Sequence, residues 1–212
     1  MTLSFAVRDI VAEPHAVTPQ LTAKLRIDDA AGRRLHAMTL RCQVRVEPQR
    51  RGYTAAEAEA LRGLFGGRER WADTVRAFPW LRCDITVPGF TGGTEVDLAL
   101  PCTYDLDVVG TAYLHALDAG TVPLTFLFSG TAFLPGTTGF AVEPVPWDRV
   151  AGYDLPVAVW RDMIEQYFPG TGWIRLDREV LDSLAAVRAR RGDVSWDETI
   201  RALLPAHDEV VA

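Results

Sequence analysis

An alternation of apolar and polar residues with a period of two recurs through the first hundred positions of this 212-residue chain. Its longest stretch, at 36–47, places Met38 and Leu40 on one face and Arg41 on the other. A strand with one buried face produces this period, because its successive side chains point to opposite sides. Such plain alternation is typical of antiparallel sheets. Shorter runs of the same kind predict strands at 20–27, 80–87 and 95–100.

Three later segments complete the predicted β region. We expect a strand over about 104–117, a strand at 122–134 that is covered on both sides because both of its faces carry apolar residues, and a short last strand at 140–145. Pro144 and Pro146 make that last strand an edge strand, since proline cannot donate to a ladder. Seven to eight strands separated by turns predict an antiparallel β-sandwich.

A helical insertion interrupts these strands at about 54–77. Thr54-Ala-Ala-Glu57 matches a capping box, in which the threonine side chain and the glutamate satisfy two free backbone N–H groups. Gly66-Gly67 can end that helix, and a second short helix is expected from Trp71 to Phe78.

The period changes from two to 3.6 after residue 146. Helices are predicted at 156–168, at 177–191 and at 195–204, the last opened by the capping box Ser195-Trp-Asp-Glu198. The chain is therefore expected to be mainly β with α (α+β). Its predicted parts are a sandwich at 1–146, a helical extension at 147–205 that packs on the sandwich, and a flexible tail at 206–212.

The net charge and the lengths of the apolar segments restrict the cellular location and the classes of partner that we expect for this chain. The net charge is −6, from 22 basic and 28 acidic side chains, so the chain lacks the positive field that nucleic-acid binding requires. No apolar run approaches the roughly 18–20 residues that span a bilayer. Charges at Arg8 and Asp9 interrupt the segment where a signal peptide would need apolar residues. We expect a cytoplasmic protein with reduced thiols, no nucleic-acid partner and no membrane insertion.

The familiar enzyme motifs are missing, and no catalytic residue or cofactor is predicted. The three cysteines have no metal-ligand spacing, although Cys83 and Cys102 could share a metal if their strands were neighbours. Asp105 and Asp107 would project from one face of the strand expected there, as paired carboxylates do in calcium sites and glycosidases. These residues support one hypothesis, a small-ligand or metal-binding protein that could be an enzyme.

Aromatic residues gather in the last third of the chain. They serve either to fix the helices on the sandwich or to anchor a protein partner, because aromatic side chains are enriched in interface hot spots. The candidates for partner binding are Trp147, Trp160, Tyr167, Trp173 and Trp196.

Several strings together resemble a known family. They are RCQVRVEP at 41–48, VPGFTGGTEVD at 87–97, PCTYD at 101–105, FSGT at 128–131, VEPVPW at 142–147 and LPVAVW at 155–160. They resemble a bacterial family catalogued only as a domain of unknown function, whose genes often neighbour nickel–iron hydrogenase genes. The resemblance implies an accessory or assembly role. The main hypothesis is therefore a non-enzymatic protein that binds a protein partner, in a hydrogenase or other oxidoreductase system, and the small-ligand or metal-binding protein is the alternative.

Overall fold

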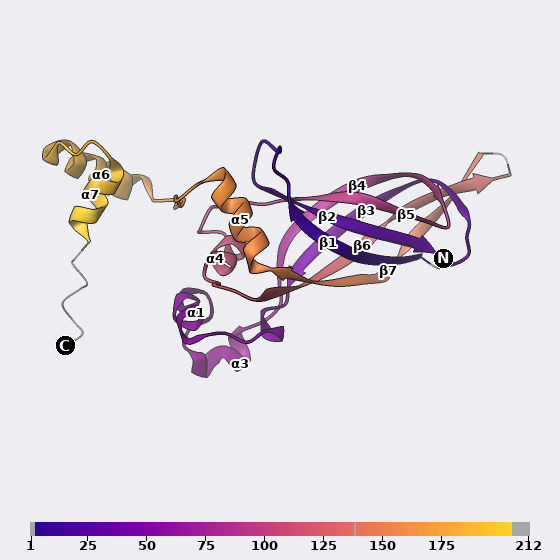
Figure 1. The fold of residues 1–212 in the computed structure, drawn as a ribbon, viewed down its shortest axis with the longest axis horizontal. Helices are drawn as coiled ribbons and strands as arrows, with labels where there is room; N and C mark the ends of the chain where they lie inside the picture. The colour runs from indigo at the N-terminus through magenta and orange to yellow at the C-terminus, as the bar shows by residue number, and fades with distance from the viewer. Residues whose placement is uncertain (1–2, 138, 205–212) are drawn as a thin grey trace. The chain divides into compact units, whose positions relative to one another are not determined.

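The structure of the chain is a computed structural model that describes residues 3–137 and 139–204 (Figure 1). It divides into two compact units, Met1–Trp173 and Ile174–Ala212. The predicted boundary at 146 falls inside a strand, and the first unit continues to Trp173.

Two antiparallel sheets form the first unit. One sheet has the order β1-β2-β5, from β1 (Leu3–Ala12), β2 (Gln20–Asp29) and β5 (Gly93–Pro101). The other has the order β4-β3-β6-β7, from β4 (Phe78–Thr91), β3 (Arg34–Val46), β6 (Thr121–Gly136) and β7 (Gly139–Pro156). The predicted β-sandwich of the α+β class is confirmed, with seven strands in the described residues.

The core lies between the two sheets and follows from the alternation in the sequence. In β2, every second side chain from Leu21 to Ile27 is fully buried. Phe5 of β1 stacks on Phe128 of β6, with ring centroids 4.6 Å apart, and so joins one sheet to the other. Burial of such apolar area stabilises the sandwich by about 25 cal/mol per Å² removed from water.

The helical insertion lies between β3 and β4. It comprises η1 (Pro48–Arg50), α1 (Ala55–Ala60), α2 (Arg62–Phe65), η2 (Arg68–Arg70) and α3 (Trp71–Thr74). The capping box of Thr54 and Glu57 is present as predicted. The second helix is shorter than expected, because β4 already begins at Phe78.

Two predictions for the later strands need correction. The strand expected over 104–117 is wrong, since this segment contains helix α4 (Val109–His115). Its buried residues have the helical spacing i, i+3, i+4 and i+7, at Gly110, Tyr113, Leu114 and Leu117. The expected short strand at 140–145 is part of the 18-residue β7, which is an edge strand as predicted.

Helix α5 (Val157–Tyr167) closes the first unit. It follows β7 directly and contacts β1, β2 and β7, with Val157, Trp160 and Met163 buried.

None of the helices in the described part of the chain combines the length and the apolar run that crossing a bilayer needs.

The second unit contains α6 (Arg178–Arg191) and α7 (Trp196–Leu203), the two helices predicted last. Gly192 ends α6 in the left-handed conformation that glycine adopts without penalty, and the predicted capping box of Ser195 and Glu198 opens α7. The predicted packing of the helical extension on the sandwich stays a prediction for α6 and α7. The expected flexible tail at 206–212 lies outside the described residues.

Candidate functional site

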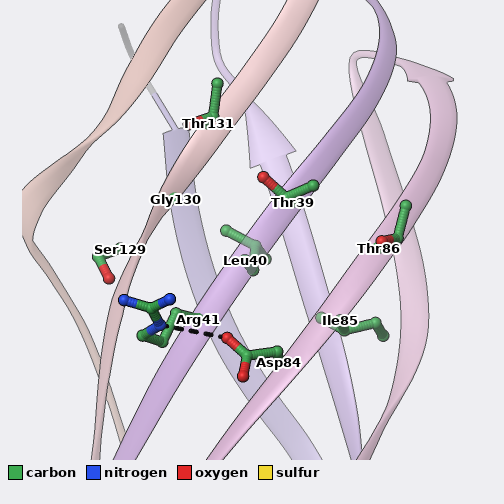
Figure 2. Close-up of a pocket in the computed structure, with 9 residues that line it drawn as sticks. All are labelled: Thr39, Leu40, Arg41, Asp84, Ile85, Thr86, Ser129, Gly130 and Thr131. Atoms are coloured by element: carbon green, nitrogen blue, oxygen red, sulfur yellow. Dashed lines mark hydrogen bonds and ion pairs between the residues drawn. The ribbon is translucent and has the colours of Figure 1, made fainter.

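A shallow hollow of about 460 Å³ lies on the solvent-facing side of the larger sheet, across β4, β3 and β6 (Figure 2). Strand register arranges its polar side chains in two rows, Thr86–Thr39–Thr131 and Asp84–Arg41–Ser129. Arg41 Nε lies 3.3 Å from Asp84 Oδ1, and both side chains are more than two-thirds exposed. An exposed pair of this kind contributes about 0–1 kcal/mol, so the hollow is a polar surface rather than a preorganised catalytic site.

A second hollow, of about 570 Å³, is lined by parts of α4, α5 and the segment that follows α5. His115 packs edge-on against Trp160, with ring centroids 6.3 Å apart. Two charged residues that line this hollow bind neighbouring loops. Arg161 donates to the carbonyl oxygen of Asp118 at 3.0 Å, and Glu165 accepts from Gly170 N at 3.0 Å. These contacts within the protein account for the positions of the Arg161 and Glu165 side chains, so no ligand is needed to explain them.

The two cysteines considered as metal ligands occupy different surroundings. Cys83 lies directly opposite Cys42 in the β3–β4 ladder, whereas Cys102 follows the end of β5. Burial raises the pKa of the Cys102 thiol to about 12, which keeps it protonated at neutral pH. Within the described residues, no group of three or more His, Cys, Asp or Glu side chains is placed to hold a metal ion.

Asp105 and Asp107 lie in the turn before α4 and not on a strand face, which corrects the geometry expected for them. Asp107 N donates to Asp105 Oδ1 at 3.0 Å, as in an Asx turn. Asp105 also forms an isolated β-bridge with Trp173, so the backbone of this turn pairs with the segment that ends the first unit.

One deeply buried carboxylate belongs to Glu57, a residue that the sequence indicates only as part of a helix cap. Glu57 is 2% exposed and accepts hydrogen bonds from Thr54 N at 2.9 Å, Asp118 N at 3.2 Å and Arg51 Nη2 at 2.8 Å. Burial alone would raise the pKa of Glu57, but these two backbone donors and the Arg51 charge hold it below its ordinary value. The carboxylate is fully used in joining the insertion to the segment before β6, so it is structural.

The five aromatic candidates for partner binding differ in burial. Trp160 is 2% exposed and belongs to the core, and Tyr167 is half-buried, with its hydroxyl 2.8 Å from the carbonyl oxygen of Glu13. Trp147, on the edge strand β7, is 88% exposed. Trp173 is about half exposed, with its ring edge-on to Tyr104. Trp160 and Tyr167 share α5, and the Phe168 and Tyr104 rings connect Tyr167 to Trp173, whereas Trp147 stands apart on β7.

Trp196, the fifth candidate, belongs to the second unit, where most apolar side chains stay exposed. Helix α6 has no buried residue, and Thr199 is the only fully buried residue among those described in this unit. The exposed apolar residues of the two helices and their end are Val180, Leu181, Trp196, Ile200, Leu203 and Leu204. We call Trp196, Ile200 and Leu203 the α7 stripe, because the spacings of four and three residues place them on one face of the helix.

Local contacts hold the α7 stripe in position. The Arg188 guanidinium lies 4.9 Å from the centre of the Trp196 ring, and Arg188 Nη2 also donates to the carbonyl of Val194. These contacts link the end of α6 to the start of α7. The sequence pointed to Trp196 but not to its neighbours, although the helical spacing of Ile200 and Leu203 was a readable signal.

Comparisons with known proteins give a family but no activity. The model of a family of unknown function (DUF6084) matches residues 1–212. A search of curated proteins finds no significant match. Solved structures that match include β-glucosidase from Kluyveromyces marxianus, at 8% identity, a TM-score of 0.24 and 72% coverage of this chain. β-Glucosidase 3B from Thermotoga neapolitana matches at 12% identity, a TM-score of 0.26 and 72% coverage. This chain spans 15% and 17% of those proteins, and we draw nothing from the likeness.

Proposed function

The chain belongs to the DUF6084 family of unknown function, and from that premise we propose that it is a non-enzymatic accessory or assembly protein. It acts by binding another protein through the apolar side chains of α6 and α7. The system in which we place it is a bacterial hydrogenase or another oxidoreductase, as the resemblance of its sequence motifs implies, and the location that we propose from its sequence is the cytoplasm.

The observation that carries this proposal is the apolar surface that the helices of the second unit do not bury against each other. The only fully buried residue described there is Thr199, whereas Leu203 is 51% exposed and Ile200 is 37% exposed. A pair of short helices draws most of its stability from the apolar face that it buries. Full burial of an exposed leucine or isoleucine contributes about 1.5–3 kcal/mol, and a partner that covers the remaining exposed part of Leu203 or Ile200 gains roughly a third to a half of that at each residue.

The partner that fits this surface offers an apolar groove. Trp196, fixed by Arg188, is the kind of rigid aromatic anchor that dominates interface energetics, and the aliphatic members of the α7 stripe flank it along the helix. A helix placed in an apolar groove is a common recognition mode that reads residues at such spacings.

Site-specific photo-crosslinking tests the proposal in the native cell. A photoreactive residue at Leu203 should yield one dominant adduct, with a subunit or maturation protein of an oxidoreductase. The matched control is Val17, which is 99% exposed in the loop between β1 and β2 and should yield no such adduct. No adduct from position 203, or the same adducts from both positions, would contradict the proposed binding surface.

A further inference from the structure

Cys42 and Cys83, which we call the cross-strand dithiol, face each other on neighbouring antiparallel strands. They are register partners in the β3–β4 ladder, and both are free thiols. Directly opposed residues in such a ladder have Cα atoms about 4.5–5.5 Å apart. A disulfide accepts Cα separations of about 4.4–6.8 Å, so the backbone already meets its main geometric requirement.

The two thiols also share one face of the sheet. Cys42 is fully buried and Cys83 is 8% exposed, whereas Arg41 and Asp84, the next register pair, point to the opposite, solvent-facing side. Cys83 Sγ lies 3.9 Å from the carbonyl oxygen of Cys42, which places the sulfur over its partner residue. Both side chains therefore occupy the same narrow space at the inner face of β3 and β4.

The pair is chemically asymmetric. The neighbouring Cys83 side chain and burial raise the pKa of the Cys42 thiol, whereas the neighbouring Cys42 side chain lowers the pKa of Cys83. Cys83 also lies on β4, an edge strand of its sheet, whereas Cys42 lies on the interior strand β3. Cys83, at 8% exposure and on the edge strand, is therefore the thiol of the pair that an outside disulfide reaches first.

We propose that the cross-strand dithiol is a reversible redox site that exchanges with a low-molecular-weight disulfide of the glutathione class. The Cys83 thiolate attacks one sulfur of that disulfide, whose S–S bond breaks, and one thiolate leaves. Cys42 loses its proton and attacks the Cys83 sulfur of the mixed disulfide, so the Cys42–Cys83 bond forms and the second thiolate leaves. The two leaving thiolates take up the two protons. One disulfide is reduced to two thiols, and the protein dithiol is oxidised.

The third cysteine supplies an internal control. Cys102 lies just beyond the last register pair of β2 and β5, where its backbone N–H donates to Pro19, and no cysteine stands opposite it. Because no second thiol stands opposite it to complete a disulfide, and because burial raises its pKa to about 12, Cys102 should stay reduced under conditions that oxidise the cross-strand dithiol.

Thiol counting on the full native chain tests the proposal. The protein is equilibrated with mixtures of reduced and oxidised glutathione, quenched with acid, unfolded and titrated for thiols. The count should fall from three per chain to one, and peptide mapping should link Cys42 to Cys83 with the loss of two hydrogen atoms. Dithiothreitol should restore three thiols.

Several outcomes would overturn the proposal. They are a count that stays at three in oxidised glutathione, a disulfide that involves Cys102, two separate glutathione adducts, and a disulfide that forms only in urea that unfolds the chain. The variant Cys42→Ala should stop at a single glutathione adduct on Cys83, whereas Cys102→Ala should still form the disulfide. Should either variant fail to fold, the wild-type count and map decide the question.

Discussion

Replacing Glu57 by glutamine removes a buried charge while keeping the shape of the side chain. One carboxylate oxygen accepts from Arg51 Nη2 and Asp118 N, and the other accepts from Thr54 N. Glutamine has a single acceptor oxygen, so one of these sites loses its acceptor and meets an N–H group instead. We expect Glu57→Gln to weaken the attachment of the helical insertion to the segment before β6.

The size of the effect follows from burial. The side chains of Glu57 and Arg51 are only 3% and 10% exposed, so water screens neither group. An unsatisfied buried donor costs about 1–3 kcal/mol, and removing one partner of a buried ion pair costs about 3–5 kcal/mol. Arg51 keeps its hydrogen bond to the carbonyl of Ala119, which places our expectation near 3 kcal/mol, at the lower end of the ion-pair range.

Thermal and urea unfolding of the full chain measure this cost. For a unit of this size, a loss of about 3 kcal/mol lowers the melting temperature by about 6–12 °C. The matched control is Glu59→Gln on the same helix, whose side chain is 73% exposed and which should change stability by less than about 0.5 kcal/mol. A cost below about 1 kcal/mol for Glu57→Gln would refute the reasoning.

The same substitution has a defined pH dependence. The pKa of Glu57 in the folded state lies below its ordinary value of 4.5, so the carboxylate contributes stability above that value. This contribution is lost as the pH falls through the folded-state pKa. The difference in unfolding free energy between wild type and Glu57→Gln should therefore be full at pH 7 and shrink below about pH 4.5. A difference that grows in acid would show that the charge is not the cause.

Three further expectations rest on separate features. Gly130→Ala would place a methyl group against the carbonyl of Thr39 and should cost about 1–3 kcal/mol in urea unfolding, whereas Gly152→Ala, with its nearest atom at 3.9 Å, should be near neutral. Trp160→Ala should cost about 3–5 kcal/mol and Trp147→Ala less than about 0.5 kcal/mol; equal costs would contradict their assignment to core and surface. Oxidation of the cross-strand dithiol, which closes a loop between residues 41 positions apart, should raise stability by up to about 4 kcal/mol. A lower unfolding midpoint after oxidation would count against unstrained closure.

Features encoded by neighbouring residues could be predicted from the sequence. The alternation of β3 and the capping boxes at Thr54 and Ser195 depend on contacts within a few positions, and the structure shows all three. The helix within 104–117 could not be predicted, because the two-residue period of a strand and the 3.6-residue period of a helix both fit part of this segment. The segment forms a helix because the helix buries Tyr113 and Leu114 together. Gly110 leaves room for the Trp80 ring, which an added Cβ would approach within 2.6 Å.

Contacts between distant segments could not be predicted. Strand order cannot be read from the sequence. Cys83 and Cys102 are therefore the predicted pair of possible metal ligands, whereas the register partner of Cys83 in the structure is Cys42. Likewise, Glu57 reaches Asp118 across 61 positions, a contact that only the packing of the insertion creates. For the proposed partner surface, the aromatic content of the last third pointed to Trp196, but only the burial of each side chain separates it from Trp160.

The central claim is that the α7 stripe binds a protein partner, and the affinity of the crosslinked partner for two variants tests it most directly. Leu203→Glu places a charge on the stripe, whereas Ala202→Glu places the same charge on the adjacent, exposed position of the same helix. Covering the exposed half of Leu203 is worth about 1 kcal/mol, and burying an unpaired carboxylate in an apolar groove costs at least about 1–3 kcal/mol more, which together correspond to at least a tenfold weaker Kd for Leu203→Glu. The account predicts that Ala202→Glu changes Kd less than twofold, and equal Kd values for the two variants would contradict it.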